Sequence, residues 1–216
     1  MVSVITIDGP ASSGKGTVAK ILATQLGFAY LESGAIYRAL GWWVNKHYPS
    51  QQVSDSQVLE LIASMQLEFK DGLIWLNQEN VTEQLRDEAI GMLASKYSSI
   101  SEVRACLLQF QRDFAKSPGL VTDGRDMGSV VFPNANLKVF LTASAEKRAE
   151  RRYKQLQQFD KNVTIGSILQ DIITRDEQDS KRSVAPLSYD SSFRVLDNSE
   201  LSVDETVGLI KAWLVN

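Results

Sequence analysis

The chain has 216 residues, which suits one globular core with room for inserted segments. Its charges nearly balance, with a formal net charge of -3, whereas proteins that bind nucleic acids or anionic membranes usually carry a basic excess. The single cysteine, Cys106, excludes an intramolecular disulfide, and its neighbours Leu107 and Leu108 favour a packed thiol. No segment is long and apolar enough to cross a bilayer, so we expect a cytoplasmic protein with no membrane partner. The balance of charges leads us to expect no nucleic-acid partner, and we expect a monomer.

The stretch Gly9–Thr17 (GPASSGKGT) is the most informative motif. It follows a β-branched run, Val2–Asp8, and precedes a helical pattern that starts near Lys15 and ends near Gly27. A strand, a glycine-rich loop and a helix in this order are typical of a phosphate-binding loop, although a glycine-rich turn without function is the alternative. Glycines let backbone N–H groups face an anion, and the helix N-terminus and Lys15 add positive charge. The residues expected to bind a nucleotide polyphosphate are Gly9, Pro10, Ala11, Ser12, Ser13, Gly14, Lys15, Gly16 and Thr17.

The loop departs from the usual pattern at one position. A Ser or Thr normally follows the lysine and contacts Mg²⁺, but here Gly16 follows it and Thr17 comes one residue later. Gly16 therefore argues against a direct contact between this loop and Mg²⁺, and if the loop does bind the ion, Thr17 is the candidate ligand.

A second strand and helix follow the first pair. Phe28–Leu31 predicts a short buried strand, and the next helix is expected to start at Glu32-Ser33-Gly34. Two strand–helix pairs in succession predict a parallel sheet with right-handed crossovers. In this second helix, Trp42 and Trp43 either bury an aromatic edge in the core or stack a base.

An antiparallel hairpin then interrupts the alternation. Leu67–Lys70 and Leu73–Leu76 flank Asp71-Gly72, a dipeptide that favours a tight hairpin turn. Such a hairpin in an alternating α/β chain predicts an inserted lobe over residues 54–90, whose function extends to about residue 115. The core is then expected to comprise residues 1–53, 91–145 and 183–216.

Two helices are expected between the hairpin and the next strand. Ser99 to Glu102 resembles a capping box that opens the second of them, and Pro118-Gly119 is expected to end it. Leu120–Asp123 and Leu137–Leu141 are the third and fourth predicted strands.

The remaining segments predict a helical lid, a last strand and a closing helix. Ser144 is the expected N-cap of a helix that carries several arginines, and a polar turn near Asp160–Asn162 leads to a second helix over about Thr164–Arg182. This helix pair is expected to form a lid over residues 146–182. Arg194–Asp197 is the fifth core strand, and a helix over Ser202–Leu214 closes the chain.

Five short strands that alternate with helices predict a three-layer α/β fold with a five-stranded parallel sheet. Ligands of such folds bind at the carboxyl ends of the strands, where Gly9–Thr17, Glu32–Arg38 and Asp123–Asp126 all lie. Asp123 ends the third strand, and it either orients Mg²⁺ through water or caps a turn.

Several motifs together resemble the bacterial cytidylate kinases of the nucleoside monophosphate kinase superfamily. They are Gly-Lys-Gly-Thr after the first strand, ESGAIYR at residues 32–38, DGRDMG at residues 123–128, and the stretch from Arg175 to Leu187. The resemblance covers essentially the whole chain, and the hairpin insert suits it. It implies a phosphate-loop kinase with a nucleoside-monophosphate-binding insert and a lid, which transfers the γ-phosphoryl group of ATP to CMP or dCMP with Mg²⁺. A kinase of UMP, AMP or shikimate and a non-catalytic nucleotide-binding module are the alternatives.

The resemblance also assigns roles to residues. The expected acceptor-binding residues are Ser33, Tyr37, Arg38, Ser95, Arg104, Arg125, Asp126, Arg175, Asp179 and Arg182. The expected catalytic cations are Lys15, Arg125, Arg151, Arg152 and Arg182. Arg148, Arg151 and Arg152 cluster on one face of the first lid helix, and at least one of them, which one being left open, is expected to stabilise the transferring phosphoryl group. Asp126, Arg104 and Ser95 match positions that recognise cytosine, since a carboxylate accepts from its amino group while Arg and Ser donate to ring acceptors. Without the resemblance, the arginines would be taken for exposed or salt-bridged surface groups.

Overall fold

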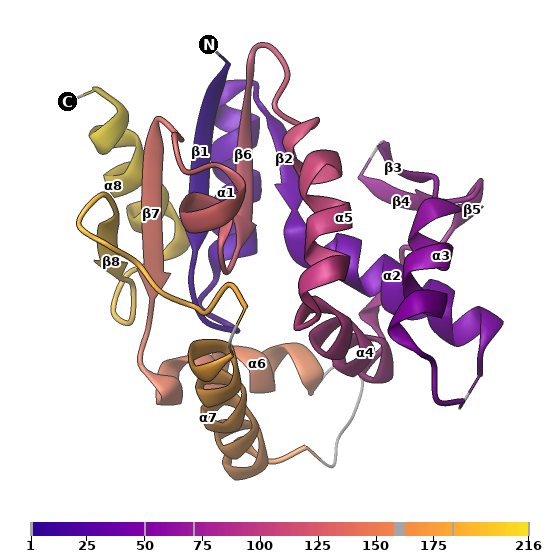
Figure 1. The fold of residues 1–216 in the computed structure, drawn as a ribbon. Helices are drawn as coiled ribbons and strands as arrows, with labels where there is room; N and C mark the ends of the chain where they lie inside the picture. The colour runs from indigo at the N-terminus through magenta and orange to yellow at the C-terminus, as the bar shows by residue number, and fades with distance from the viewer. Residues whose placement is uncertain (1, 50, 71, 158–162, 183, 216) are drawn as a thin grey trace. The chain divides into compact units, whose positions relative to one another are not determined.

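The computed structural model describes residues 2–49, 51–70, 72–157, 163–182 and 184–215. Contacts divide the chain into two compact units, which Figure 1 shows in one ribbon. We call Met1–Leu31 with Phe114–Asn216 the core unit and Glu32–Asp113 the insert unit. The expected limits of the inserted lobe and the lid stay predictions.

The core unit is built on the predicted five-stranded parallel sheet, whose strands lie in the order β2-β6-β1-β7-β8 (Figure 1). Its strands are β1 (Ser3–Asp8), β2 (Ala29–Glu32), β6 (Gly119–Gly124), β7 (Leu137–Thr142) and β8 (Arg194–Asp197). The central strand β1 pairs in parallel with β6 and β7, so that Ile7 lies beside both Asp123 and Val139. Strand β2 is at the edge, and for this reason only Leu31 of its residues is buried, although the whole strand was expected to be.

Two helices cover one face of this sheet, and a shorter segment lies on the other. Helices α1 (Lys15–Leu26) and α8 (Val203–Val215) pack on β1, β6 and β7 through one apolar cluster. The members of this cluster on β1 are Ile5 and Ile7. Alternate residues of a strand point to opposite faces, so Thr6 and Asp8 lie on the other side of the sheet. There the π-helical turn η2 (Met127–Val131) contacts β1.

The predicted lid helices are present as α6 (Ala145–Leu156) and α7 (Ile165–Lys181). They pack on each other around buried Ala149, Ile168 and Ile172. Ser144 and Thr164 cap their N-termini, because each side-chain oxygen accepts an N–H from the first turn. The polar turn expected near Asp160–Asn162 lies outside the described residues.

The insert unit combines helices with a second, smaller sheet. Its helices are α2 (Ser33–His47), α3 (Asp55–Ala63), η1 (Gln84–Arg86), α4 (Glu88–Ser98) and α5 (Ser101–Arg112), and its strands are β3 (Leu67–Lys70), β4 (Leu73–Leu76) and β5 (Glu79–Asn80). The predicted hairpin is confirmed, since β3 and β4 pair antiparallel with Glu68 opposite Trp75. Its turn residue Asp71 lies outside the described residues. Helix α3 and strand β5 were not predicted.

Three local predictions for the insert unit were wrong. Ser99 does not cap α5, because its hydroxyl donates to the Lys96 carbonyl at the end of α4. Helix α5 ends at Arg112, well before the proline and glycine expected to end it. The thiol of Cys106 is exposed rather than packed, because the buried stripe of α5 runs along Val103, Leu107 and Gln111 and Cys106 lies to one side of it.

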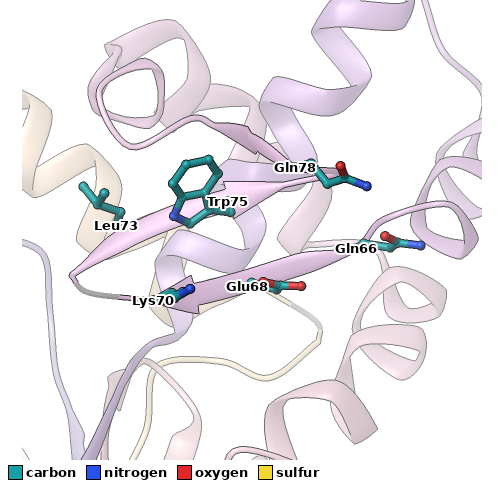
Figure 2. A pocket seen from close by; sticks show the side chains of 6 residues that line it. All are labelled: Gln66, Glu68, Lys70, Leu73, Trp75 and Gln78. Carbon is teal, nitrogen blue, oxygen red and sulfur yellow. The ribbon is translucent and has the colours of Figure 1, made fainter.

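The outer face of the small sheet carries an open groove of about 290 Å³ (Figure 2). Its lining residues are Gln66, Glu68, Lys70, Leu73, Trp75 and Gln78. The side chains of β3 and β4 alternate between this face and the interior, where Leu67 and Leu76 are buried. The groove contains none of the residues that the sequence assigned to a site. Within the described residues, no helix has the length and apolar character needed to span a membrane.

Candidate active site

The glycine loop after β1 is shaped by one very close approach. A Cβ atom on Gly9 would lie 2.1 Å from the carbonyl oxygen of Leu141 on β7, so only glycine fits there. Gly14 precedes α1 with a φ of 87°, a left-handed conformation that glycine adopts without strain. The loop conformation therefore depends on glycine at both positions.

Donors from three side chains bind the carbonyl groups of this loop. Arg148 donates to the Ala11 oxygen at 3.2 Å and Arg151 to the Ser13 oxygen at 3.1 Å. Asn198, which follows β8, also donates to Ser13 at 3.0 Å. These bonds fix the loop and offset the partial negative charge of its carbonyls, which would repel a phosphate.

Arg148 ties the loop to both lid helices. Its side chain is 6% exposed, and the guanidinium donates two hydrogen bonds to Asp176 of α7, at 3.0 and 2.6 Å. Its Nε donates to the Ala143 carbonyl at the end of β7. Arg148 therefore links α6 to α7, to the loop and to the sheet, and sequence reasoning assigned it no individual role.

Arg151 and Arg152 were expected among the catalytic cations, and the structure places both on α6. The guanidinium of Arg151 donates to both oxygens of Asn198, at 3.0 and 2.8 Å. Arg152 is half-buried. Their catalytic roles stay predictions.

Asp123, Tyr30 and Lys15 meet beside the start of α1. The Tyr30 hydroxyl donates to Asp123 at 2.8 Å, and Lys15 donates to the Pro10 carbonyl at 3.3 Å. Burial raises the pKa of Asp123, while Lys15, Tyr30 and Arg125 act in the opposite direction. Tyr30 was missed because nothing local in an edge strand marks it as a partner of Asp123.

The position of Asp123 fits a Mg²⁺ ion that is shared with phosphates. A Cβ on Gly16 would lie 3.8 Å from one Asp123 oxygen, so the carboxylate closely approaches the loop. Mg²⁺ is commonly bound by one or two carboxylates together with substrate phosphates and water. The described residues contain no group of three or more potential metal ligands, so an all-protein site is not formed by them.

Asp8, the last residue of β1, has a fully buried carboxylate. Its oxygens accept the backbone N–H groups of Met127 and Gly128, at 2.8 and 2.7 Å. Burial, together with the nearby charges of Asp126 and Asp123, raises the pKa of Asp8 to about 7, against the opposing effect of the two N–H groups. The sequence signal was an acidic residue at the end of an otherwise uncharged strand.

Another charged cluster in the core unit surrounds Asp179 of α7. Arg125 donates to one Asp179 oxygen at 2.7 Å, and a nitrogen of Arg182 lies 4.0 Å from the other. Burial would raise the pKa of Asp179, but the charges of Arg125, Arg175 and Arg182 outweigh it, so the pKa is lowered. Three cations thus surround one carboxylate, as suits the binding of a further anion.

Asp126 lies next to this cluster in sequence and is buried. Its carbonyl oxygen accepts the N–H groups of Val130 and Val131, at 2.9 and 3.2 Å. The residue thereby closes the π-helical turn η2.

The insert unit contains the remaining predicted acceptor residues. Arg38 of α2 donates to the carbonyls of Leu85 and Asp87, at 2.9 and 3.2 Å, and a Cβ on Gly91 would lie 3.0 Å from its guanidinium. The Arg104 guanidinium of α5 lies 5.5 Å from the centre of the Tyr37 ring.

The two serines of the predicted set lie on helices of the same unit. Ser33 begins α2 and is buried. Ser95 is half-buried on α4, one turn after Gly91, and therefore shares its helix face. The structure thus places all five acceptor residues expected in this unit on α2, α4 and α5.

The parallel sheet and the glycine loop between β1 and α1 define the core unit as a phosphate-loop domain. A solved structure of an uncharacterized protein from Eubacterium ventriosum shares the fold, with a TM-score of 0.57, 15% identity and coverage of 100% of this chain and 99% of that chain.

Sequence comparison identifies the family. The family model for cytidylate kinase matches residues 5–214. A cytidylate kinase from Chromobacterium violaceum is 48% identical over 212 residues, which are 98% of this chain and 95% of the relative. A cytidylate kinase from Nitrosomonas europaea is 46% identical over 210 residues, 97% of this chain and 93% of the relative. The chain belongs to the cytidylate kinase family, as its motifs predicted.

Replacing Gly9 with Ala should destabilise the folded protein. The added Cβ meets a backbone oxygen, so β1 or β7 must move, and we expect a loss of about 2 kcal/mol or more in the free energy of unfolding. Chemical denaturation measures this. Gly208→Ala is the control, because its Cβ meets nothing within 4 Å inside α8. Equal stability of the two variants would contradict the close approach at Gly9.

Replacing Asp176 with Asn should destabilise the lid helices. The change leaves the buried Arg148 without its ionic partner, so we expect a loss of about 2 kcal/mol in the free energy of unfolding. Glu177→Gln is the matched control, since its partner Lys181 is exposed and such pairs contribute about 0.5 kcal/mol. A loss at Asp176 no larger than at Glu177 would refute the role of this ion pair.

The raised pKa of Asp8 predicts a pH-dependent stability. The unfolded chain releases this proton near pH 4 and the folded protein near pH 7, so the folded state binds more protons in between and its stability falls as pH rises. Between pH 5 and pH 8 the free energy of unfolding of the wild type should fall by about 3 kcal/mol relative to that of Asp8→Asn. Chemical denaturation measures this, with EDTA present to remove divalent cations. Identical pH profiles for both proteins would show that Asp8 has an ordinary pKa.

Proposed function

We propose that the protein transfers the γ-phosphoryl group of ATP to CMP or dCMP, forming ADP and CDP or dCDP. The observation that carries this proposal is the presence of two anion-binding arrangements in a chain of the cytidylate kinase family. One is the loop Gly9–Thr17, and the other is the arginine cluster around Asp179.

The reaction needs alignment and charge neutralisation more than acid–base chemistry. A phosphate oxygen of the acceptor attacks the γ-phosphorus of ATP, the bond between that phosphorus and the β–γ bridging oxygen breaks, and ADP leaves. The attacking oxygen is already anionic, so no side-chain base is required. Placing two polyanions in line is unfavourable in water, and nearby cations make it possible.

The loop and Lys15 serve the donor. Backbone N–H groups of the loop bind the phosphates of ATP, and the Lys15 ammonium neutralises the β- and γ-phosphates. Asp123 would orient Mg²⁺ through water, with Thr17 as the second candidate ligand, and the ion when bound neutralises phosphate charge. The buried position of Asp123 beside Lys15 supports this role.

Arginines serve the acceptor phosphate and the moving phosphoryl group. Arg38, Arg125 and Arg182 bind the acceptor phosphate, for which a planar guanidinium fork is well suited. Arg175 and Asp179 contact the sugar. At least one lid arginine, for which Arg151 and Arg152 are the candidates, stabilises the phosphoryl group when the lid closes and excludes water.

The choice of base depends on Asp126, with Arg104 and Ser95. A carboxylate accepts from the cytosine amino group, whereas uracil would present a carbonyl oxygen and leave two acceptors facing each other. This mismatch should cost about 1–3 kcal/mol. The burial of Asp126 supports the role, because an unpaired acceptor costs more away from water.

The protein acts as a monomer in the cytoplasm on small nucleotides and has no nucleic-acid or membrane partner.

An assay of ADP release across CMP, dCMP, UMP, AMP and shikimate tests the function. We expect release with CMP and dCMP and much slower release with the other acceptors. Comparable rates with UMP would refute base recognition, faster release with AMP or shikimate would indicate another acceptor, and no release with any acceptor would favour a non-catalytic module.

Replacing Asp126 with Ala should weaken CMP binding selectively. Loss of the acceptor for the amino group should raise KM for CMP about tenfold or more and leave KM for ATP within about threefold. Steady-state kinetics with each substrate varied in turn measures both constants. Equal increases in the two constants would mean that Asp126 does not recognise the base.

A further inference from the structure

Asp8 makes contacts that the proposed reaction does not use. It ends β1 directly before Gly9, and its carboxylate is completely buried on the face of the sheet that carries η2. Its two oxygens accept two consecutive backbone N–H groups, from Met127 and Gly128. These are the two residues that follow Asp126.

The two bonds fix the main chain after Asp126 against the sheet. The space there is tight, because a Cβ on Gly128 would lie 2.7 Å from the Thr6 hydroxyl and 2.8 Å from the Phe193 ring. The segment therefore has no room to move closer to the sheet, and it moves away only if both bonds to Asp8 break.

A carboxylate is the side chain that this arrangement requires. Two N–H groups need two acceptor atoms, and an ionised Asp supplies both, whereas Asn would turn a donor toward one of them. The placement carries a cost, because the charges of Asp126 and Asp123 act unfavourably on Asp8. Filling space alone would not need a buried carboxyl group beside two other acidic residues.

We propose that Asp8 is the positioning residue for base recognition. Through Met127 and Gly128 it sets the main chain from which the Asp126 carboxylate meets the cytosine amino group. Because Gly9 follows Asp8, one short segment orders both the loop that binds ATP and the residue proposed to recognise cytosine, Asp126. This inference rests on the proposed role of Asp126.

The test compares Asp8→Asn with the matched control Thr122→Val. Thr122 of β6 is paired with Thr6 of β1 and is as buried as Asp8, and valine has nearly its shape. For Asp8→Asn we expect KM for CMP to rise about tenfold, the preference for CMP over UMP in kcat/KM to fall about tenfold, and KM for ATP to stay within about threefold. Thr122→Val should leave all three quantities within about twofold.

A purely structural role predicts a different result. Asp8→Asn would then lower stability but retain the wild-type preference for CMP over UMP, or it would raise both KM values equally, and either result overturns the inference. A wild type without any preference for CMP would instead refute the proposed function, and with it the inference.

Hydrogen exchange in the wild type gives an independent test if Asp8→Asn does not fold. Amide exchange at Met127 and Gly128 should be slow in the nucleotide-free protein and unchanged by CMP, because Asp8 already binds both groups. Fast exchange that slows only when CMP binds would overturn the inference.

Discussion

The close approach of Gly9 to the Leu141 carbonyl is the constraint on which the core unit depends. It brings the end of β1 against β7 and determines where the loop turns into α1. Arg148, Arg151 and Asn198 then bind the outward carbonyls of the loop, and this requires α6 and the segment after β8 to lie beside it. A local steric requirement thereby determines which elements surround the phosphate-binding loop.

The second requirement is compensation of buried charge. Asp8 is compensated by two backbone N–H groups, Asp123 by Tyr30 and Lys15, and Asp179 by three arginines. Each arrangement keeps a carboxylate or a cation inside the protein without leaving it unpaired. In the proposed reaction, substrate phosphates join the clusters at Asp123 and Asp179, whose cations are already held in place by these carboxylates.

The sequence predicted those features whose signals are local. The strands of the parallel sheet, the loop, the hairpin and the cap at Ser144 each depend on neighbouring residues, and all are present. The two-residue strand β5 is too short to have a pattern of its own. The capping pair at Ser54 and Gln57 was a readable sign of α3 that was overlooked.

The residues that were missed depend on contacts distant in sequence. Tyr30 meets Asp123 across 93 positions, and Asp8 meets Gly128 across 120. Nothing near Tyr30 or Asp8 identifies these partners, because the parallel sheet brings them together. Ser99 was misassigned for a related reason. A serine between two helices can bond either to the end of the first helix or to the start of the second, and here the turn after α4 directs its hydroxyl to the Lys96 carbonyl.

The central claim is that donor and acceptor phosphates are bound by separate cationic groups. Calorimetric titration of a non-hydrolysable ATP analogue and of CMP into Lys15→Ala and Arg125→Ala tests it most directly. The account predicts that Lys15→Ala lowers the affinity for the ATP analogue and leaves the affinity for CMP unchanged. Arg125→Ala should lower the affinity for CMP and leave the affinity for the analogue unchanged. An equal loss of affinity for both ligands in either variant would contradict it.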